Sequence, residues 1–139
     1  PVVFCGAQPR SAVAERLAQA HLLLAPSVTA ADGDQEGIPV AIMEAMAQGL
    51  VVVTTRHSGI PELVKDGVTG FLAEEGDEAS LLGALRRAAA RPEAWPSLSA
   101  SARQKVEADF DQAEWNARLF EIVERFAQRK GNPCAASCT

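Results

Sequence analysis

The sequence predicts an α/β fold, a parallel sheet flanked by helices, and two observations lead to it. Short apolar runs bounded by turn residues recur at residues 2–4, 21–26, 51–55 and 69–73. The first three read as strands that are buried on both faces of a parallel sheet. A helix-like stretch follows each run, and this alternation is typical of βαβ units.

The helices between these runs have recognisable ends. Residues 9–20 follow the first run, and residues 77–90 follow the fourth. Asp77 is of a residue type that caps helix N-termini with a side-chain oxygen, so the second of these helices is expected to begin there. Both stretches space their apolar residues three or four positions apart, which gives one buried stripe on each helix. The stripes consist of Val13, Leu17 and Ala20 in the first helix and of Leu81, Leu82, Leu85 and Ala88 in the second.

A long final helix is predicted for residues 111–131. Asp111 and Glu114 form a pairing related to the capping box, and Gly131 is expected to end the helix. Before this helix, the prolines within residues 90–101 indicate a break between helices. The apolar face of the final helix consists of Trp115, Leu119, Ile122, Val123 and Phe126.

The bulk properties describe one acidic domain. The chain has 139 residues, 47% of them hydrophobic, and a formal net charge of -5. Residues 1–130 are therefore expected to form a single domain, followed by an irregular tail at residues 131–139. An acidic surface argues against nucleic acid as a partner. No apolar run reaches the roughly 18 to 20 residues of a membrane-spanning helix, and a cytoplasmic location is expected.

The three cysteines do not suggest a metal or disulfide framework. Cys5 stands near the N-terminus, whereas Cys134 and Cys138 lie in the predicted tail. An odd number with this spacing is a poor basis for disulfides or for a zinc site. We therefore expect reduced thiols and no metal.

The loop after the second predicted strand, residues 28–39, is where a ligand is expected. Open α/β sheets bind ligands beyond the carboxyl ends of their strands. Gly37 permits close approach to the backbone, and Pro39 suits the first position of a helix over residues 40–48, which Gly49 can end. A helix N-terminus that follows a glycine offers free N–H groups and a partial positive charge. These features favour an anionic ligand.

Two glutamates flank the start of this helix. On a helical wheel Glu44 falls on the margin of the predicted buried arc, where an unpaired carboxylate costs several kcal/mol and needs a partner. A carboxylate can accept two hydrogen bonds side by side, which matches the vicinal hydroxyls of a ribose. Glu36, at the junction of loop and helix, faces whatever lies before the helix N-terminus. The predicted buried arc consists of Val40, Met43, Met46 and Ala47.

Two sequence blocks carry a resemblance to a known family. They are "EGIPVAIMEAMAQG" at residues 36–49 and "HSGIPELVKDGVTGFL" at residues 57–72. With seven residues between Glu36 and Glu44, the chain resembles the donor-site signature of retaining glycosyltransferase family 4, the group 1 glycosyltransferases. The resemblance extends from about residue 1 to residue 125 and is strongest to members that build bacterial exopolysaccharides. It implies the Rossmann-like C-terminal, nucleotide-sugar-binding half of a GT-B fold.

The resemblance also assigns roles to single residues. It makes Glu44 the ligand of the donor ribose and Glu36 a catalytic contact to the donor sugar. The backbone from Gly37 through Ile38 and Pro39 to Val40 is implied to line the sugar and the diphosphate. No metal is obligatory in this family, because positive side chains and helix dipoles stabilise the leaving diphosphate.

Simpler interpretations compete with these roles. Glu36 also suits a first-turn helix charge that needs no ligand, and Glu44 alone would be an ordinary surface residue. Ser58 and Gly59 lie in the loop after the third predicted strand. They are donor-binding candidates, but capping of the short helix that begins near Pro61 explains that loop equally well.

The chain also departs from the family pattern. Members have two further strand-helix units before the segment that matches residues 2–4, including an arginine and a lysine that hold the phosphates, and an N-terminal acceptor domain. The chain therefore reads as a fragment that is inactive by itself. The missing strands would leave residues 21–26 with an open edge, so a homodimer through that edge or through the final helix is expected.

Two hypotheses of function follow. The first is the donor-binding part of a retaining, metal-independent transferase that moves a sugar from a nucleotide-sugar to a saccharide or lipid-linked acceptor in exopolysaccharide or cell-envelope glycan synthesis. The alternative is a non-catalytic, truncated Rossmann-like module that oligomerises or binds nucleotides. A dehydrogenase half is disfavoured, because no G-x-G-x-x-G turn follows a strand. The base, the sugar and the acceptor stay open.

Overall fold

The structure is a computed structural model that describes residues 2–130. Its contacts divide the chain into two units, residues 1–107 and residues 108–139. The predicted tail at residues 131–139 and the predicted helix end at Gly131 lie outside the described residues.

The first unit is built on a three-stranded parallel sheet, which confirms the predicted α/β class. Its strands are β1 (Leu22–Ala25), β2 (Val51–Thr55) and β3 (Phe71–Ala73). They lie in the order β1-β2-β3, with Leu22 opposite Val51 and Val53 opposite Phe71. All five residues of β2 are buried, as expected for a central strand covered on both faces.

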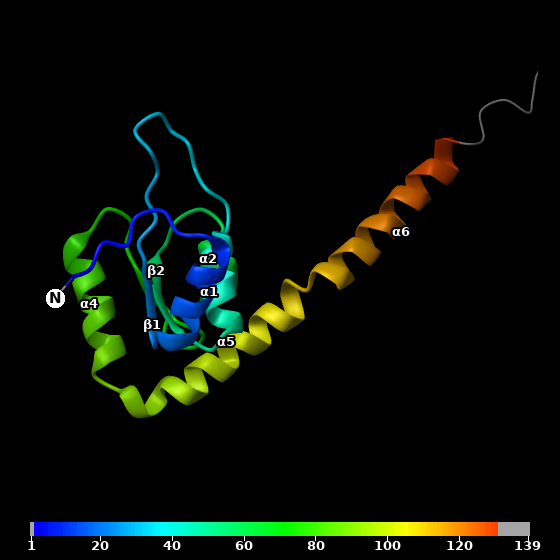
Figure 1. The fold of residues 1–139 in the computed structure, drawn as a ribbon. Helices are drawn as coiled ribbons and strands as arrows, with labels where there is room; N and C mark the ends of the chain where they lie inside the picture. The colour runs from blue at the N-terminus through cyan, green and yellow to red at the C-terminus, as the bar shows by residue number, and fades with distance from the viewer. Residues whose placement is uncertain (1, 131–139) are drawn as a thin grey trace, which may run out of the picture. The chain divides into compact units, whose positions relative to one another are not determined.

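Helices cover both faces of this sheet (Figure 1). Helix α4 packs on β2 and β3, whereas α2 contacts β1 and β2, and Figure 1 shows α4 on one side of the sheet with α1 and α2 on the other. Side chains alternate along β2, so Val51 and Val53 join the apolar cluster under α4 while Val52 points to the opposite face. The helices of this unit are α1 (Arg10–Gln19), α2 (Val40–Ala47), α3 (Ile60–Leu63), α4 (Glu78–Ala89) and α5 (Trp95–Asp109), with a 3-10 helix, η1 (Pro92–Ala94), before α5.

Two predicted helix ends are observed. The Asp77 side chain accepts a hydrogen bond from the Ser80 N–H at 2.9 Å and so caps α4. Gly49 has a φ of 86°. The N–H groups of Gly49 and Leu50 return to the carbonyls of Met46 and Ala45, which is the bonding pattern of a Schellman motif.

The prediction of a strand at residues 2–4 was wrong. These residues form no strand, and Val2, Val3 and Phe4 are 83%, 76% and 94% exposed. A strand needs a hydrogen-bonding neighbour, and the sheet of the described residues ends at β1. As predicted, β1 is an edge strand. It is also less buried than predicted, with Leu24 at 43% exposure.

The predicted break at residues 90–101 is much shorter than expected. Helix α5 begins at Trp95, so only the few residues around η1 interrupt the helices. Pro96 falls in the first turn of α5, where a missing N–H removes no intrahelical bond. The Trp95 indole N–H donates to the Ala88 carbonyl at 2.9 Å and ties the start of α5 to α4.

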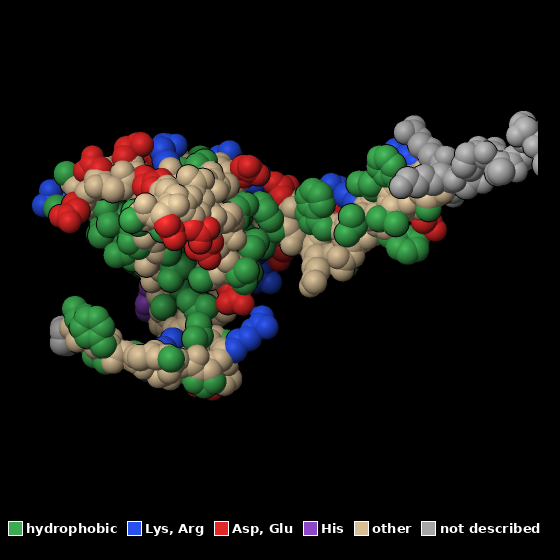
Figure 2. All heavy atoms as spheres, turned by 90° about the horizontal axis from the view of Figure 1, so that it is seen from above, with side chains coloured by type: hydrophobic (Ala, Val, Ile, Leu, Met, Phe, Trp, Pro, Cys, Tyr) green, Lys and Arg blue, Asp and Glu red, His purple; other side chains and the backbone are tan. Residues whose placement is uncertain are grey.

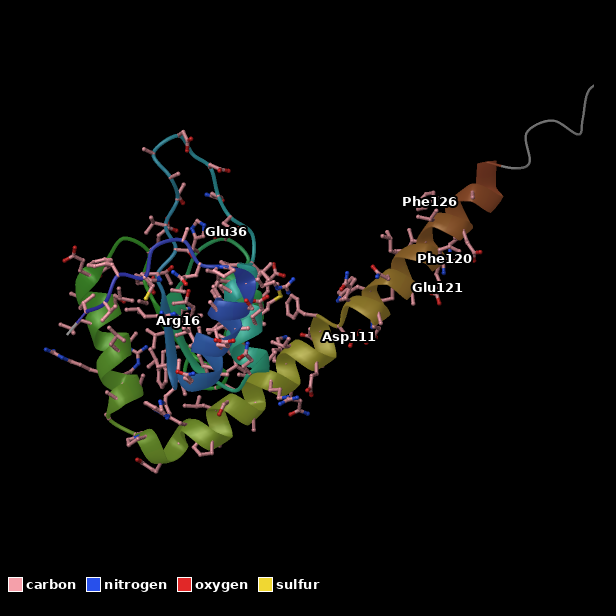
Figure 3. All side chains as sticks on the ribbon, in the orientation of Figure 1. Arg16, Glu36, Asp111, Phe120, Glu121 and Phe126 are labelled. Atoms are coloured by element: carbon pink, nitrogen blue, oxygen red, sulfur yellow. The ribbon has the colours of Figure 1, made fainter. Side chains whose placement is uncertain are left out.

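The second unit contains helix α6 (Gln112–Lys130). Asp111 accepts from the N–H groups of Ala113 and Glu114 at 2.8 and 3.2 Å, which confirms the predicted N-cap. The apolar side chains of α6 lie at the surface in Figure 2, and Figure 3 shows Phe120 and Phe126 projecting from the helix. Trp115, Leu119, Phe120, Ile122, Val123 and Phe126 are each 50–65% exposed.

Candidate functional site

The loops beyond the carboxyl ends of the three strands are bonded to one another. The Thr55 hydroxyl at the end of β2 donates to the Ser27 carbonyl beyond β1 at 2.5 Å. The Arg56 N–H donates to the Ala73 carbonyl at the end of β3, at 2.8 Å. Because of these bonds, the loop between β1 and α2, residues 26–39, shares one edge of the sheet with the two loops that follow β2 and β3.

Glu36 lies at the end of the longest of these loops. Figure 3 shows Glu36 on the limb of residues 26–39 that descends to α2, and its side chain is exposed. Figure 2 looks down on this edge of the sheet and shows acidic side chains on it. An exposed carboxylate at a helix N-terminus is available to a ligand and is also compatible with a simple helix charge.

The segment from Gly37 to Val40 includes residues in different environments. Gly37 is exposed, Ile38 is half-buried and Pro39 is buried, whereas Val40 is 61% exposed. Pro39 is the N-cap of α2 and not its first helical residue, a difference of one position from the prediction.

Gly59 brings the second candidate loop against the first. A Cβ placed on Gly59 would lie 2.9 Å from Cγ1 of Ile38 and 3.8 Å from the carbonyl carbon of Gly37. Only a residue without a side chain allows this approach. Ser58, next to it, has a φ of 45°, a backbone conformation that costs a non-glycine residue about 1 kcal/mol or more. Two separate candidate segments, residues 36–40 and residues 58–59, thus meet at the carboxyl edge of the sheet.

Glu44 is partly buried and has a partner that the sequence did not suggest. Its side chain is 34% exposed, and its Oε1 lies 3.2 Å from Nη2 of Arg10, the first residue of α1. Arg10 is 91% exposed, so this ion pair is strongly screened by solvent and contributes little to stability. A carboxylate with one weakly held partner remains suited to accept hydroxyl groups from a ligand.

The predicted buried arc of α2 was wrong in its phase. The residues that α2 buries are Ile42, Ala45 and Met46, whereas Val40 is exposed and Met43 and Ala47 are only half-buried. Only Met46 is common to the predicted and the observed buried faces, because α2 packs on β1 and β2 through a face that is rotated toward Ile42 and Ala45. The intermediate burial of Glu44 agrees with its predicted marginal position, although the arc itself is different.

His57 and Glu75 form a cluster that sequence reasoning missed. His57, directly before Ser58, is 1% exposed, and its Nδ1 lies 3.0 Å from Oε2 of Glu75. The other Glu75 oxygen, Oε1, accepts from the Thr29 N–H at 2.5 Å. No short motif joins these three residues. A loop histidine is ordinarily solvated, so only the fold reveals its burial.

These bonds stabilise the ionised form of Glu75. The Thr29 backbone N–H, then the His57 ring and the Thr29 side chain, lower the pKa of Glu75 from 4.5 to about 2, and partial burial opposes the shift. Glu75 is therefore a carboxylate at neutral pH.

A cavity of about 720 Å³ lies at a different place in the same unit. Its walls include Phe71 at the start of β3, Arg87 near the end of α4 and Leu98 in α5. Arg87 pairs there with Asp66 at 3.0 Å and stacks on the Phe71 ring at 5.9 Å. This is the amino edge of the sheet, so this cavity does not coincide with the predicted donor site.

Within residues 2–130, no three His, Cys, Asp or Glu side chains lie close enough together to hold a metal ion. In the same part of the chain, no helix has the length and apolarity that crossing a bilayer demands.

Two of the curated relatives are bacterial enzymes named for polysaccharide biosynthesis. The chain is 47% identical over 126 residues to the amylovoran biosynthesis glycosyltransferase AmsK of Erwinia amylovora, which covers 91% of the chain and 31% of AmsK. It is 47% identical over 122 residues to the putative colanic acid biosynthesis glycosyltransferase WcaL of Escherichia coli, covering 86% of the chain and 30% of WcaL. The chain thus spans less than a third of the length of these relatives.

Solved structures have the same fold. Anabaena HepE in complex with UDP and glucose matches with a TM-score of 0.70 and 26% identity, over 80% of this chain and 29% of HepE. The C-terminal domain of the group 1 protein LpcC from Francisella tularensis matches with a TM-score of 0.62 and 15% identity, over 80% of this chain and 53% of that domain chain. Both matches agree with the predicted partial GT-B architecture.

A sequence model of the family described as "Glycosyl transferases group 1" matches residues 1–91, which is more than half of the chain. Together with the two relatives that are 47% identical, this match identifies the chain as a member of the group 1 glycosyltransferases.

Proposed function

We propose that this chain is the donor-binding part of a retaining, metal-independent glycosyltransferase. The complete enzyme would transfer a sugar from a nucleotide-sugar to a saccharide or lipid-linked acceptor in exopolysaccharide or cell-envelope glycan synthesis. The observation that carries the proposal is the approach of Gly59 to Ile38, which joins residues 36–40 and 58–59 into one rim at the carboxyl edge of the sheet.

Each end of the donor has a carboxylate in this proposal. Glu44 accepts hydrogen bonds from the two ribose hydroxyls, and the ligand competes with the solvent-screened Arg10 for Oε1. Glu36 contacts the sugar, eight positions earlier and at the other end of the first turn of α2. The first turn of α2 lies between Glu36 and Glu44, so the diphosphate is placed between the two carboxylates.

The backbone between the carboxylates receives the diphosphate. Val40 and Ala41 are the first residues of α2, and the first N–H groups of a helix have no partner within it. During transfer the bond between the sugar and the diphosphate breaks, and negative charge grows on the leaving diphosphate. Fixed N–H groups aimed at that charge lower the barrier without a metal.

The relatives supply the donor class. HepE is solved with UDP and glucose, and its likeness covers 80% of this chain. A nucleoside diphosphate sugar is therefore the first donor to test. A separate acceptor-binding domain, a cytoplasmic location and a homodimer through the β1 edge or α6 remain predictions of the proposal.

Titration calorimetry tests the donor site. The 139-residue chain is titrated with UDP-glucose, GDP-mannose and ADP-glucose, with Glu44→Ala as the variant and Glu15→Ala, on the exposed surface of α1, as the matched control. We expect one donor to bind, and Glu44→Ala to weaken it by at least about tenfold, which corresponds to roughly 1.4 kcal/mol. Equal affinity of Glu44→Ala and Glu15→Ala, or no binding of any donor, would contradict the proposal.

A further inference from the structure

We propose that Glu75 is a positioning residue of the donor site: it holds Thr29, in the loop that carries Glu36, against the buried His57 that precedes Ser58 and Gly59. This inference rests on the proposed function. It adds a third loop, the one after β3, to the two loops that the donor is proposed to touch.

The charge of Glu75 determines the direction of its hydrogen bond with His57. Glu75 is ionised and a carboxylate can only accept, so the hydrogen between the two residues belongs to Nδ1 of His57. The Nδ1–H therefore donates to Oε2 at 3.0 Å, while the Thr29 N–H donates to Oε1 at 2.5 Å. One carboxylate joins the loops after β1 and β2.

The side chain of His57 is buried. The ring is 1% exposed, and its Nε2 is enclosed and has no hydrogen-bond partner among the described residues. A buried polar atom without a partner costs free energy, so it calls for an explanation. The burial places the ring where its Nδ1–H holds the Glu75 carboxylate. The backbone carbonyl of His57 also accepts from the Ile60 N–H, which anchors the residue at the start of α3.

Hydrogen bonds within the loop of residues 26–39 connect Thr29 to the limb that carries Glu36. The two limbs of the loop are bonded to each other, because the Ala30 N–H donates to the Asp34 carbonyl at 3.0 Å. The Gln35 amide group also lies 3.4 Å from the Thr29 hydroxyl. Gln35 precedes Glu36, so the bond between Thr29 and Glu75 restrains the limb on which Glu36 lies.

Glu74 provides a matched control. It is the neighbouring glutamate, and its Oε1 pairs with Nε of Arg56 at 3.0 Å with both side chains largely exposed. Among the described residues, no hydrogen bond or ion pair joins Glu74 to Thr29 or His57. Glu75→Gln and Glu74→Gln therefore remove the same charge from adjacent positions, and only the first disturbs the bond to His57.

The experiment compares nucleotide with nucleotide-sugar. Three pairs, UDP with UDP-glucose, GDP with GDP-mannose and ADP with ADP-glucose, are titrated into wild type, Glu75→Gln and Glu74→Gln. In the pair that wild type binds, we expect Glu75→Gln to lose about fivefold in affinity for the nucleotide-sugar and to keep its affinity for the nucleotide within about twofold, because a loosened loop must be ordered around the sugar. Glu74→Gln should behave as wild type.

A second measurement uses the unmutated chain. Nitrogen NMR of the His57 ring should find Nδ1 protonated in wild type and in Glu74→Gln. In Glu75→Gln, the chemical shift of Nδ1 should differ from that of wild type. An unprotonated Nδ1 in wild type would overturn the inference regardless of how the variants fold.

The outcomes separate the two proposals. In one outcome, wild type binds a donor while both variants keep the wild-type ratio of nucleotide-sugar affinity to nucleotide affinity. That result would overturn the role of Glu75 but would not contradict the donor site. No binding by wild type to any of the six compounds would overturn the donor site, and the positioning role with it.

Discussion

The two edges of the parallel sheet use their polar groups differently. At the amino edge, Nη2 of Arg87 donates to Asp66 and to the Leu72 carbonyl, and a cavity of about 720 Å³ lies there. At the carboxyl edge, within residues 2–130, Glu36 is exposed, Glu44 pairs with an exposed arginine and Nε2 of His57 has no hydrogen-bond partner. A cavity alone is therefore a poorer guide to a ligand site than polar groups left with bonding capacity.

The largest expected effect concerns the amino edge and is one of stability alone. A Cβ on Gly70, just before β3, would lie 2.8 Å from the Val52 carbonyl oxygen and 3.0 Å from Cγ1 of Val64. Because a backbone atom and a buried side chain would have to move, Gly70→Ala should lower the free energy of unfolding by about 1–3 kcal/mol. Urea denaturation measures this. An unchanged midpoint would show that the sheet is less tightly packed there than described.

Substitution of a glycine at the carboxyl edge should lower donor affinity more than stability. Gly59→Ala forces Ile38 away by its Cγ1, at 2.9 Å, and so widens the rim formed by residues 36–40 and 58–59. We expect donor affinity to fall by about tenfold, with a smaller loss of stability than in Gly70→Ala. Calorimetric titration at a temperature where both variants are folded checks this. An equal loss of donor affinity in Gly59→Ala and Gly70→Ala would contradict the assignment of donor binding to the carboxyl edge alone.

Acid should loosen the carboxyl edge through Glu75. Its pKa in the folded chain is about 2, below the ordinary 4.5, so its stabilising effect is complete above about pH 4.5 and is lost as the pH falls toward 2. The difference in unfolding midpoint between wild type and Glu75→Gln should therefore shrink from pH 7 to pH 2. Urea unfolding across this range measures it, with Glu74→Gln as reference. A constant difference at every pH would contradict the bonds assigned to Glu75.

The smallest expected effect is at Ser58. Its φ of 45° is unfavourable for serine and open to glycine, so Ser58→Gly should stabilise the fold by up to about 1 kcal/mol. A thermal melt measures the shift. If the serine side chain serves the donor, affinity should fall in the same variant. A destabilised variant would indicate that the serine side chain contributes more than the backbone strain costs.

Much of the first unit could be predicted from local sequence. The apolar run at residues 51–55, the cap at Asp77 and the helix end at Gly49 each follow from a short-range rule. The rule that strand ends converge at one edge of a parallel sheet also led to residues 36–40 and 58–59 as neighbours.

The remaining features depend on contacts between distant residues. The pair of Arg10 with Glu44 spans 34 positions, and the pair of His57 with Glu75 spans 18, so no local pattern indicates either. The run at residues 2–4 has strand-like composition, but no strand of the described residues pairs with it. Helix α5 was not predicted, because Pro92 and Pro96 indicate a break between helices, although Pro96 lies in a first turn that tolerates it.

The most direct test of the central claim is a map of where a nucleotide-sugar touches the chain. Backbone amide NMR shifts are recorded for wild type during titration with the donor it binds best among UDP-glucose, GDP-mannose and ADP-glucose. The account predicts that the largest changes fall at the amides of residues 36–41, 44 and 57–59. Changes that cluster instead around Arg87, Leu98 and the cavity at the amino edge, or no changes with any donor, would contradict it.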